Sequence, residues 1–196
     1  APAPSEASLG LAWDVLNVTA EMLYAKEQFK YIEYNMQDDV LKYFQRKLGV
    51  SKDDAANTLM HKICSRLEAG SGNGEILSRP PKYFVNPDPN IDAFRAIGNV
   101  ITVNAGVFYS YGYNEDMVAM IVAHEMAHGA KLHIMQRIDG VITLNAARNL
   151  YAKRYDIELS RLDFLDGVIN QIQAKGYSIP SEWEADNTGF DCLVNV

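Results

Sequence analysis

The stretch NEDMVAMIVAHEMAHGAKLHIMQRI, residues 114–138, indicates more about the fold than any other part of the chain. Asn114 is a residue type that caps helices, and Glu115 and Asp116 follow in the first turn, where carboxylates favour the positive end of the helix dipole. The apolar residues that follow form a stripe too wide for a surface helix; they are Met117, Met120, Ile121, Val122, Met126 and Ala127. The stretch therefore predicts a helix buried in the body of the protein.

The same stretch holds two histidines and a glutamate in the pattern H-E-x-x-H: His124, Glu125 and His128. Positions four residues apart differ by about 400° around a helix, so both imidazoles leave one face within about 40° and can bind one metal ion. Glu125 lies beside them, where a carboxylate can accept the proton of a metal-bound water and pass it to a leaving amine. The pattern predicts a catalytic site with one Zn²⁺ per chain. The alternative is a core helix with two internally bonded histidines, which requires partners for three buried polar side chains.

A catalytic zinc site needs a third protein ligand. The extended pattern H-E-x-x-H-x-x-G-x-x-H requires glycine and histidine at positions where this chain has Lys131 and Ile134. His133 misses by one position, and on a continuing helix it is turned about 140° away from His128. These mismatches favour a carboxylate ligand from another part of the chain.

The segment SIPSEWEAD, residues 178–186, supplies the best carboxylate candidates. Its proline and second serine predict the start of a helix, with acidic residues in the first turns. Glu182 and Asp186 lie four residues apart on one face, so one can bind the metal while the other accepts the second ring N–H of a ligand histidine. Glu184 points elsewhere on such a helix. An ordinary solvated acidic helix start is the alternative.

With both motifs in place, the chain resembles the HtpX-like family of zinc endopeptidases, to which the CAAX prenyl proteases also belong. The segment DAFRAIGNVITVNAGV, residues 92–107, looks like that family's N-A-F-A…G-G…I-x-V…G-L segment. The resemblance covers roughly residues 55–192. It departs from the family at Asp92, Arg95 and Asn99, where relatives have asparagine, alanine and glycine.

The resemblance implies a fold and a set of roles. The fold is α+β: a helix-rich, zincin-like (gluzincin) metalloprotease domain with a small β-sheet over the H-E-x-x-H helix. Glu182 is the implied third ligand, with Asp186 behind it. A histidine five residues after the motif, His133, also fits the family.

The sequence outside the motifs predicts mostly helices. Residues 1–48 are expected to form an N-terminal helical segment, which either serves as a scaffold or shields the cleft, and residues 49–196 the catalytic domain, the two together making one compact domain. Ser51-Lys52-Asp53-Asp54 resembles a capping box that opens a second helix. Residues 141–175 are predicted to be helical again.

Two segments read as strands, residues 82–86 and 99–104, separated by a proline-rich turn. In gluzincin-type sites an edge strand holds the substrate as an additional antiparallel strand, through main-chain hydrogen bonds that do not read side chains. The candidate substrate strand is Val100, Ile101, Thr102 and Val103. An ordinary buried strand is the alternative.

Composition limits the possible partners. The chain has 196 residues, 48% of them hydrophobic, which is enough for a sizeable core. Its net charge of −7, without a basic run, makes nucleic acid and anionic membrane surfaces poor partners. The longest apolar run, residues 117–123, is too short to span a bilayer, so we expect no transmembrane segment in this chain and a soluble, catalytic-domain-only member of the family.

The chain opens with Ala1-Pro2-Ala3-Pro4 and without an initiator methionine, which favours processing after export. We therefore expect a periplasmic or otherwise extracytoplasmic location, with a cytoplasmic one as the alternative. Cys64 falls among apolar helix positions and is expected to be a small buried thiol. It could pair with Cys192 if their helices meet.

Together these observations predict a zinc-dependent endopeptidase that hydrolyses peptide bonds in unfolded or misfolded polypeptides. His124, His128 and Glu182 are the expected ligands, and Glu125 the base and proton shuttle. The alternative is a non-catalytic or latent chaperone-like binding protein that retains the zinc site. Glu125 argues against it, because a structural site needs no base beside an open position. The sequence does not indicate the oligomeric state.

Overall fold

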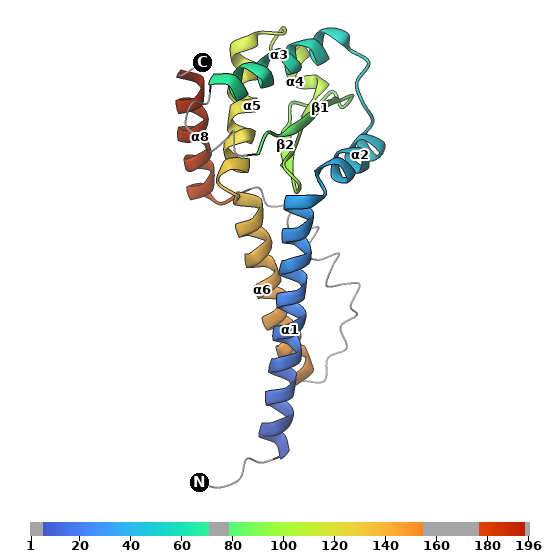
Figure 1. Cartoon of the computed structure of the whole chain (residues 1–196), viewed down its shortest axis with the longest axis vertical. Coiled ribbons are helices and arrows are strands. Elements are labelled where there is room, and N and C mark those ends of the chain that lie inside the picture. The colour runs from blue at the N-terminus through green and yellow to red at the C-terminus, as the bar shows by residue number, and fades with distance from the viewer. Residues whose placement is uncertain (1–5, 71–78, 155–176, 195–196) are drawn as a thin grey trace. The chain divides into compact units, whose positions relative to one another are not determined.

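The computed structural model of the chain describes residues 6–70, 79–154 and 177–194 (Figure 1). The chain divides into two compact units, one made of Ala1–Tyr31 with Met135–Gly176 and the other of Ile32–Ile134 with Tyr177–Val196. This division differs from the predicted boundary between residues 48 and 49, because residues 32–48 belong with the sheet. The predicted helix over 141–175 lies partly outside the described residues.

The first unit is built on two long helices, α1 (Glu6–Asn35) up to Tyr31 and α6 (His133–Arg154) from Met135 onward. They lie side by side in Figure 1, and Lys26 of α1 forms an ion pair with Asp139 of α6 at 3.5 Å. Among the described side chains, their buried apolar ones are Val18, Ile138, Ile142 and Ala146.

The second unit contains the small sheet that the sequence predicts. Its strands are β1 (Lys82–Asn86), β2 (Ala93–Ala96) and β3 (Val100–Asn104), in the order β1-β3-β2. β1 is parallel to β3, whereas β2 is antiparallel to it. The strand prediction for residues 82–86 is confirmed, and that for 99–104 is confirmed to within one residue; residues 93–96 form a further strand that was not predicted separately.

The predicted substrate strand is wrong. Val100, Ile101, Thr102 and Val103 lie in β3, the central strand, which pairs with β1 on one side and with β2 on the other. All of β3 is buried, so its main chain has no free edge for a substrate. A run of β-branched residues indicates a buried strand, but it does not distinguish the centre of a small sheet from its edge.

Two of the helices that pack against the sheet precede it in the chain. α2 (Gln37–Leu48) covers one side, where Val40 joins Phe84, Ala96 and Val100 in a small apolar cluster. α3 (Asp54–Gly70) packs against β1 and contributes Met60, Ile63, Cys64 and Leu67 to the main core.

The capping box predicted before α3 has a different capping residue. Asp53 caps the helix, since its Oδ1 accepts the Ala56 N–H at 3.0 Å, while Ser51 Oγ accepts the Asp53 N–H at 3.2 Å. The buried environment expected for Cys64 is confirmed. Cys64 and Cys192 are both free thiols.

The motif helix is α5 (Glu115–Ala130), reached through the short helix α4 (Ala105–Ser110). Its predicted cap is confirmed: Asn114 Oδ1 accepts the Met117 N–H at 3.1 Å. α8 (Ile179–Val194) packs along α5, and a Cβ on Gly189 would lie 3.1 Å from the Ala123 carbonyl carbon. This close approach of the two backbones brings the acidic first turns of α8 beside the histidines of α5.

The motif helix does not continue to Ile138, as the apolar pattern suggested. α5 ends at Ala130, Leu132 adopts a left-handed φ of 55°, and α6 begins at His133. No glycine marks this break, which is why the sequence pattern did not reveal it. The break changes the direction in which His133 points.

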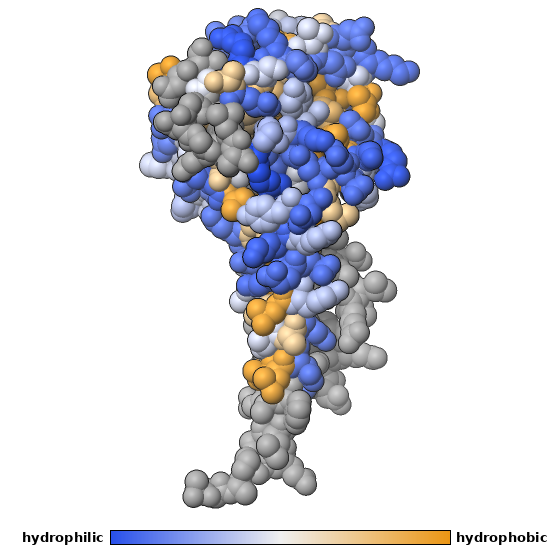
Figure 2. All heavy atoms as spheres, viewed as in Figure 1, coloured by the Kyte–Doolittle hydropathy of each residue, from blue (hydrophilic) through white to orange (hydrophobic). Residues whose placement is uncertain are grey.

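No described helix is both long enough and apolar enough to cross a membrane. Figure 2 shows that hydrophilic residues cover most of the described surface on the face drawn, with hydrophobic ones in small separate groups. On this face, the described residues show no broad apolar surface.

Candidate metal centre

Two helices supply the predicted ligands. His124 and His128 project from α5, and Glu182 projects from the first turn of α8. The two histidine Nε2 atoms lie 2.9 Å apart, and Glu182 Oε2 lies 3.1 Å from His124 Nε2 and 3.6 Å from His128 Nε2. Zinc bonds of about 2.0–2.1 Å in a tetrahedron place ligand atoms about 3.3 Å apart. The three candidate ligands therefore have the spacing that one metal ion requires.

His124 is oriented by Asp186, one helical turn after Glu182. The His124 Nδ1 atom lies 2.9 Å from Asp186 Oδ1. Because an ionised carboxylate only accepts hydrogen bonds, Nδ1 carries the ring proton and Nε2 presents a lone pair. Asp186 therefore occupies the position in which it was predicted to orient a ligand histidine.

His128 is oriented by an arrangement that the sequence reasoning did not predict. Its Nδ1 lies 2.8 Å from His133 Nδ1, and His133 Nε2 lies 3.1 Å from Glu184 Oε2. The expectations that His133 turns away from His128 and that Glu184 points elsewhere are wrong, because the break after α5 returns His133 toward the site. The Glu184 carboxylate accepts from His133 Nε2–H, so in the neutral ring His133 Nδ1 accepts the N–H of His128.

The hydrogen bonds of His124 with Asp186 and of His128 with His133 leave the Nε2 atoms of both ligand candidates without a proton. His124 Nε2, His128 Nε2 and the Glu182 carboxylate then direct three lone-pair donors at one point. Such a set repels itself unless a cation lies between its members, and two imidazoles with one carboxylate are a donor set of catalytic zinc sites. The side chains present therefore fit a zinc ion.

Tyr177 was not predicted either. Its ring stacks on the His128 ring, with centroids 3.9 Å apart and planes inclined by 19°. Burial lowers the pKa of His128 to about 3, and the adjacent His124 and His133 rings act in the same direction. The His128 ring is therefore neutral at physiological pH, the form in which imidazole binds metals. Among the many tyrosines, nothing in the spacing singles out Tyr177.

Glu125 lies on α5 where this helix packs against β2. It is 8% exposed, and its Oε2 has no hydrogen-bond partner among the described residues. Burial raises the pKa of Glu125 to about 8, while a hydrogen bond from the Arg95 backbone N–H partly opposes this rise. A buried carboxyl with one free oxygen is suited to accept and release a proton beside the three donors.

Two histidines and a glutamate that converge from neighbouring helices, with a second glutamate beside them, define a site of the metallopeptidase class. The chain belongs to peptidase family M48, whose family model matches residues 40–195. This match confirms the resemblance to HtpX-like endopeptidases and the helix-rich α+β fold.

A relative from Vibrio cholerae serotype O1, provisionally named a beta-barrel assembly-enhancing protease, is 22% identical over 129 residues. The aligned part is 66% of this chain and 23% of the relative. The chain thus spans about a quarter of the length of that relative.

Proposed function

We propose that this metallopeptidase is a zinc-dependent endopeptidase that cleaves unfolded or misfolded polypeptides. One observation carries the proposal: His124, His128 and Glu182 present three donor atoms at the spacing of one metal ion, and the buried Glu125 follows His124 on the same helix. A structural metal site requires the ligands but not the adjacent base.

A zinc ion held by these ligands would polarise the scissile carbonyl and lower the pKa of the attacking water. The free Oε2 of Glu125 accepts a proton from that water as its oxygen bonds to the carbonyl carbon. When the C–N bond breaks, Glu125 returns the proton to the leaving amine. Asp186 and His133 hold the histidine rings in the required tautomers throughout.

The substrate-binding element of this proposal is β2 rather than β3. β2 pairs with one strand only among the described residues, and it lies against α5 beside Glu125. An extended peptide can donate main-chain N–H groups to the carbonyls of its outer edge, a contact that does not depend on sequence, while the Ala93 and Arg95 N–H groups of that edge are held by Asp92 and Glu125. Such binding requires an unfolded segment of substrate, and this supports misfolded polypeptides as the substrate class.

We also propose an extracytoplasmic location. The name of the Vibrio cholerae relative connects it with β-barrel assembly, and β-barrel proteins of this kind lie in bacterial outer membranes. A peptidase that removes misfolded clients of that process would act in the periplasm.

The test measures zinc content and casein cleavage for the wild-type chain and for Glu125→Gln. We expect one zinc per chain in both proteins, with the turnover of the variant reduced by about 10²–10⁴-fold because it lacks a base. Zinc in both proteins with cleavage in neither would favour the latent or chaperone-like alternative. Absence of zinc from both would exclude the proposed ligands.

A further inference from the structure

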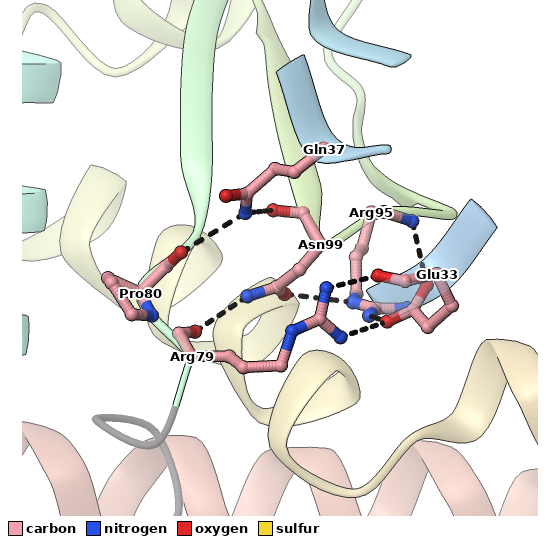
Figure 3. Close-up of polar contacts among 7 residues, drawn as sticks. Glu33, Gln37, Arg79, Pro80, Arg95 and Asn99 are labelled. Carbon is pink, nitrogen blue, oxygen red and sulfur yellow. Dashed lines mark hydrogen bonds and ion pairs between the residues drawn. The ribbon is translucent and has the colours of Figure 1, made fainter. Parts of the chain in front are cut away.

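Four residues form a polar group around the buried end of β2, called here the Glu33 cluster: Glu33, Arg79, Arg95 and Asn99 (Figure 3). Glu33 lies near the end of α1, in the part of that helix that belongs to the second unit, and is 0% exposed. Its carboxylate accepts hydrogen bonds from Arg79 Nη1 at 2.9 Å, from Arg95 Nη2, and from the Gly98 backbone N–H at 2.7 Å. A buried carboxylate with three donors has a fixed position, since its displacement would leave charges unpaired.

Arg95 and Asn99 extend this cluster to the motif helix. Arg95 Nε donates to Asn99 Oδ1 at 3.2 Å. A Cβ added to Gly129 would lie 2.5 Å from Asn99 Oδ1 and 2.9 Å from Arg95 Nε, so both polar atoms pack directly on the backbone of Gly129. Gly129 follows the ligand His128 in the last turn of α5.

The main chain of Arg95 contacts the other part of the site. Arg95 belongs to β2, and its backbone N–H hydrogen-bonds to the carboxyl of Glu125. One residue therefore contacts the catalytic base through its backbone and the ligand-bearing turn through its side chain. A shift of Arg95 would move both contacts together.

The family resemblance does not account for this arrangement. Arg95 and Asn99 stand where HtpX-like relatives have alanine and glycine, and Glu33 precedes the residues 40–195 that the family model matches. The three unusual residues contact one another or share a partner, so they act as one unit.

We propose that three members of the Glu33 cluster, Glu33, Arg95 and Asn99, are a positioning device of the active site, in which Glu33 holds Arg95 and Asn99 against Gly129 and thereby fixes the places of His128 and Glu125. Arg79 also pairs with Glu33, but its side chain is 28% exposed and does not reach Gly129, so it lies outside this device. Arg95 is a positioning residue, because it acts through other residues and not on the substrate. The catalytic readout of this inference rests on the proposed endopeptidase function. A misplacement of about 1 Å at a catalytic centre lowers rates by up to about 10²-fold.

The test compares Arg95→Met with Arg79→Met in the full chain. Both changes remove one guanidinium from Glu33, but only the first removes a contact with Gly129. Measured well below the unfolding temperature of each variant, kcat for a casein-derived peptide should fall by about tenfold or more in Arg95→Met, with KM changed less than about twofold. Zinc release to a chelator should accelerate as well. In Arg79→Met, kcat and the rate of zinc release should both stay within about twofold of the wild type. Equal losses in the two variants, or wild-type kcat in Arg95→Met, would overturn the proposal.

A second readout does not depend on metal or activity. In ¹H–¹⁵N spectra of the metal-free full chain, the His128 ring signals should shift in Arg95→Met and stay in place in Arg79→Met. Unchanged His128 signals in a folded Arg95→Met protein would overturn the positioning role. A wild-type chain without zinc or casein cleavage would instead contradict the proposed function, so the two failures are distinguishable.

A further variant covers the case in which Arg95→Met does not fold. Gly129→Ala brings a methyl group against both Asn99 Oδ1 and Arg95 Nε, so it pushes the two polar atoms away from the turn that carries His128. We expect kcat to fall by about tenfold or more, with KM changed less than about twofold. Wild-type kcat in a folded Gly129→Ala protein would overturn the positioning role.

Discussion

Burial determines the protonation of Glu125 in the metal-free chain. Its carboxyl lies in the core beside β2, and burial raises its pKa from the ordinary 4.5 to about 8. Between these two values the folded chain holds a proton that the unfolded chain releases. The free energy of unfolding therefore falls as the pH rises from about 4.5 to about 8.

Glu125→Gln should consequently stabilise the metal-free chain at neutral pH. Glutamine does not ionise, so the variant lacks the cost of a buried charge, and its gain at pH 8 should be on the order of a few kcal/mol. The gain should shrink toward zero near pH 4.5, where the wild-type carboxyl is protonated in the folded chain and largely so in the unfolded one. Denaturant unfolding in the presence of a chelator, at pH 4.5, 6 and 8, measures this. If the difference in unfolding free energy between Glu125→Gln and the wild type were the same at all three pH values, the pKa of Glu125 would not be raised by folding.

The residues of the site were predictable where helix geometry fixes them. His124, Glu125 and His128 lie on α5, and the spacing of Glu182 and Asp186 places both on one face of α8. The structure brings these two helices together, although metal binding itself stays a prediction. The partners of His128 were not predictable. Their placement depends on the left-handed φ of Leu132, a conformation that a leucine side chain disfavours and that no sequence signal announces.

Glu182, the candidate third ligand, reaches the site through the contact between α5 and α8. These helices approach most closely where Gly189 faces the backbone of Ala123 and His124. The first turn of α8 is held at its distance from the histidines by this contact, because a helix transmits a displacement along its axis. The position of Glu182 therefore depends on a glycine two turns away.

Gly189→Val should weaken metal binding without changing a ligand. A Cβ at this position lies 3.1–3.2 Å from backbone atoms of Ala123 and His124, so the larger side chain must push α8 outward and carry Glu182 with it. We expect the zinc dissociation constant to rise by about tenfold or more, measured by competition with a chromophoric chelator. Gly140→Val on α6 is the matched control, because a Cβ there meets nothing within 4 Å. Equal zinc affinity in the two variants would contradict this account of α8.

The elements themselves were predicted unevenly. The strand over 82–86 and the capped start of α5 follow from local patterns, and both are confirmed. The order of the strands is a tertiary property: β2 is short and contains Arg95, so its pattern does not indicate a strand, and without β2 the sequence pattern of β3 is compatible with an edge strand. The charge of Arg95 in β2 is compensated by Glu33, a residue that is distant in the sequence.

The division of the chain into two units predicts where bound metal changes stability. All three candidate ligands belong to the second unit, Ile32–Ile134 with Tyr177–Val196. A ligand that binds only the folded site stabilises it by about 2.7 kcal/mol at a hundredfold excess over its dissociation constant. Zinc should therefore slow amide hydrogen exchange most strongly in α5 and α8, and a chelator should reverse this. Equal slowing in the first-unit part of α1 would contradict a site confined to the second unit.

The chain leaves the second unit after Ile134 and returns to it at Tyr177. His133 and Tyr177, which lie at these two points, both contact the His128 ring. This order has a consequence for biosynthesis. A nascent chain that has emerged from the ribosome only as far as α6 contains both histidines and the base, but not yet Tyr177, Glu182 or Asp186. With Glu182 as the candidate third ligand and Asp186 behind His124, the complete site cannot assemble until translation has passed residue 186.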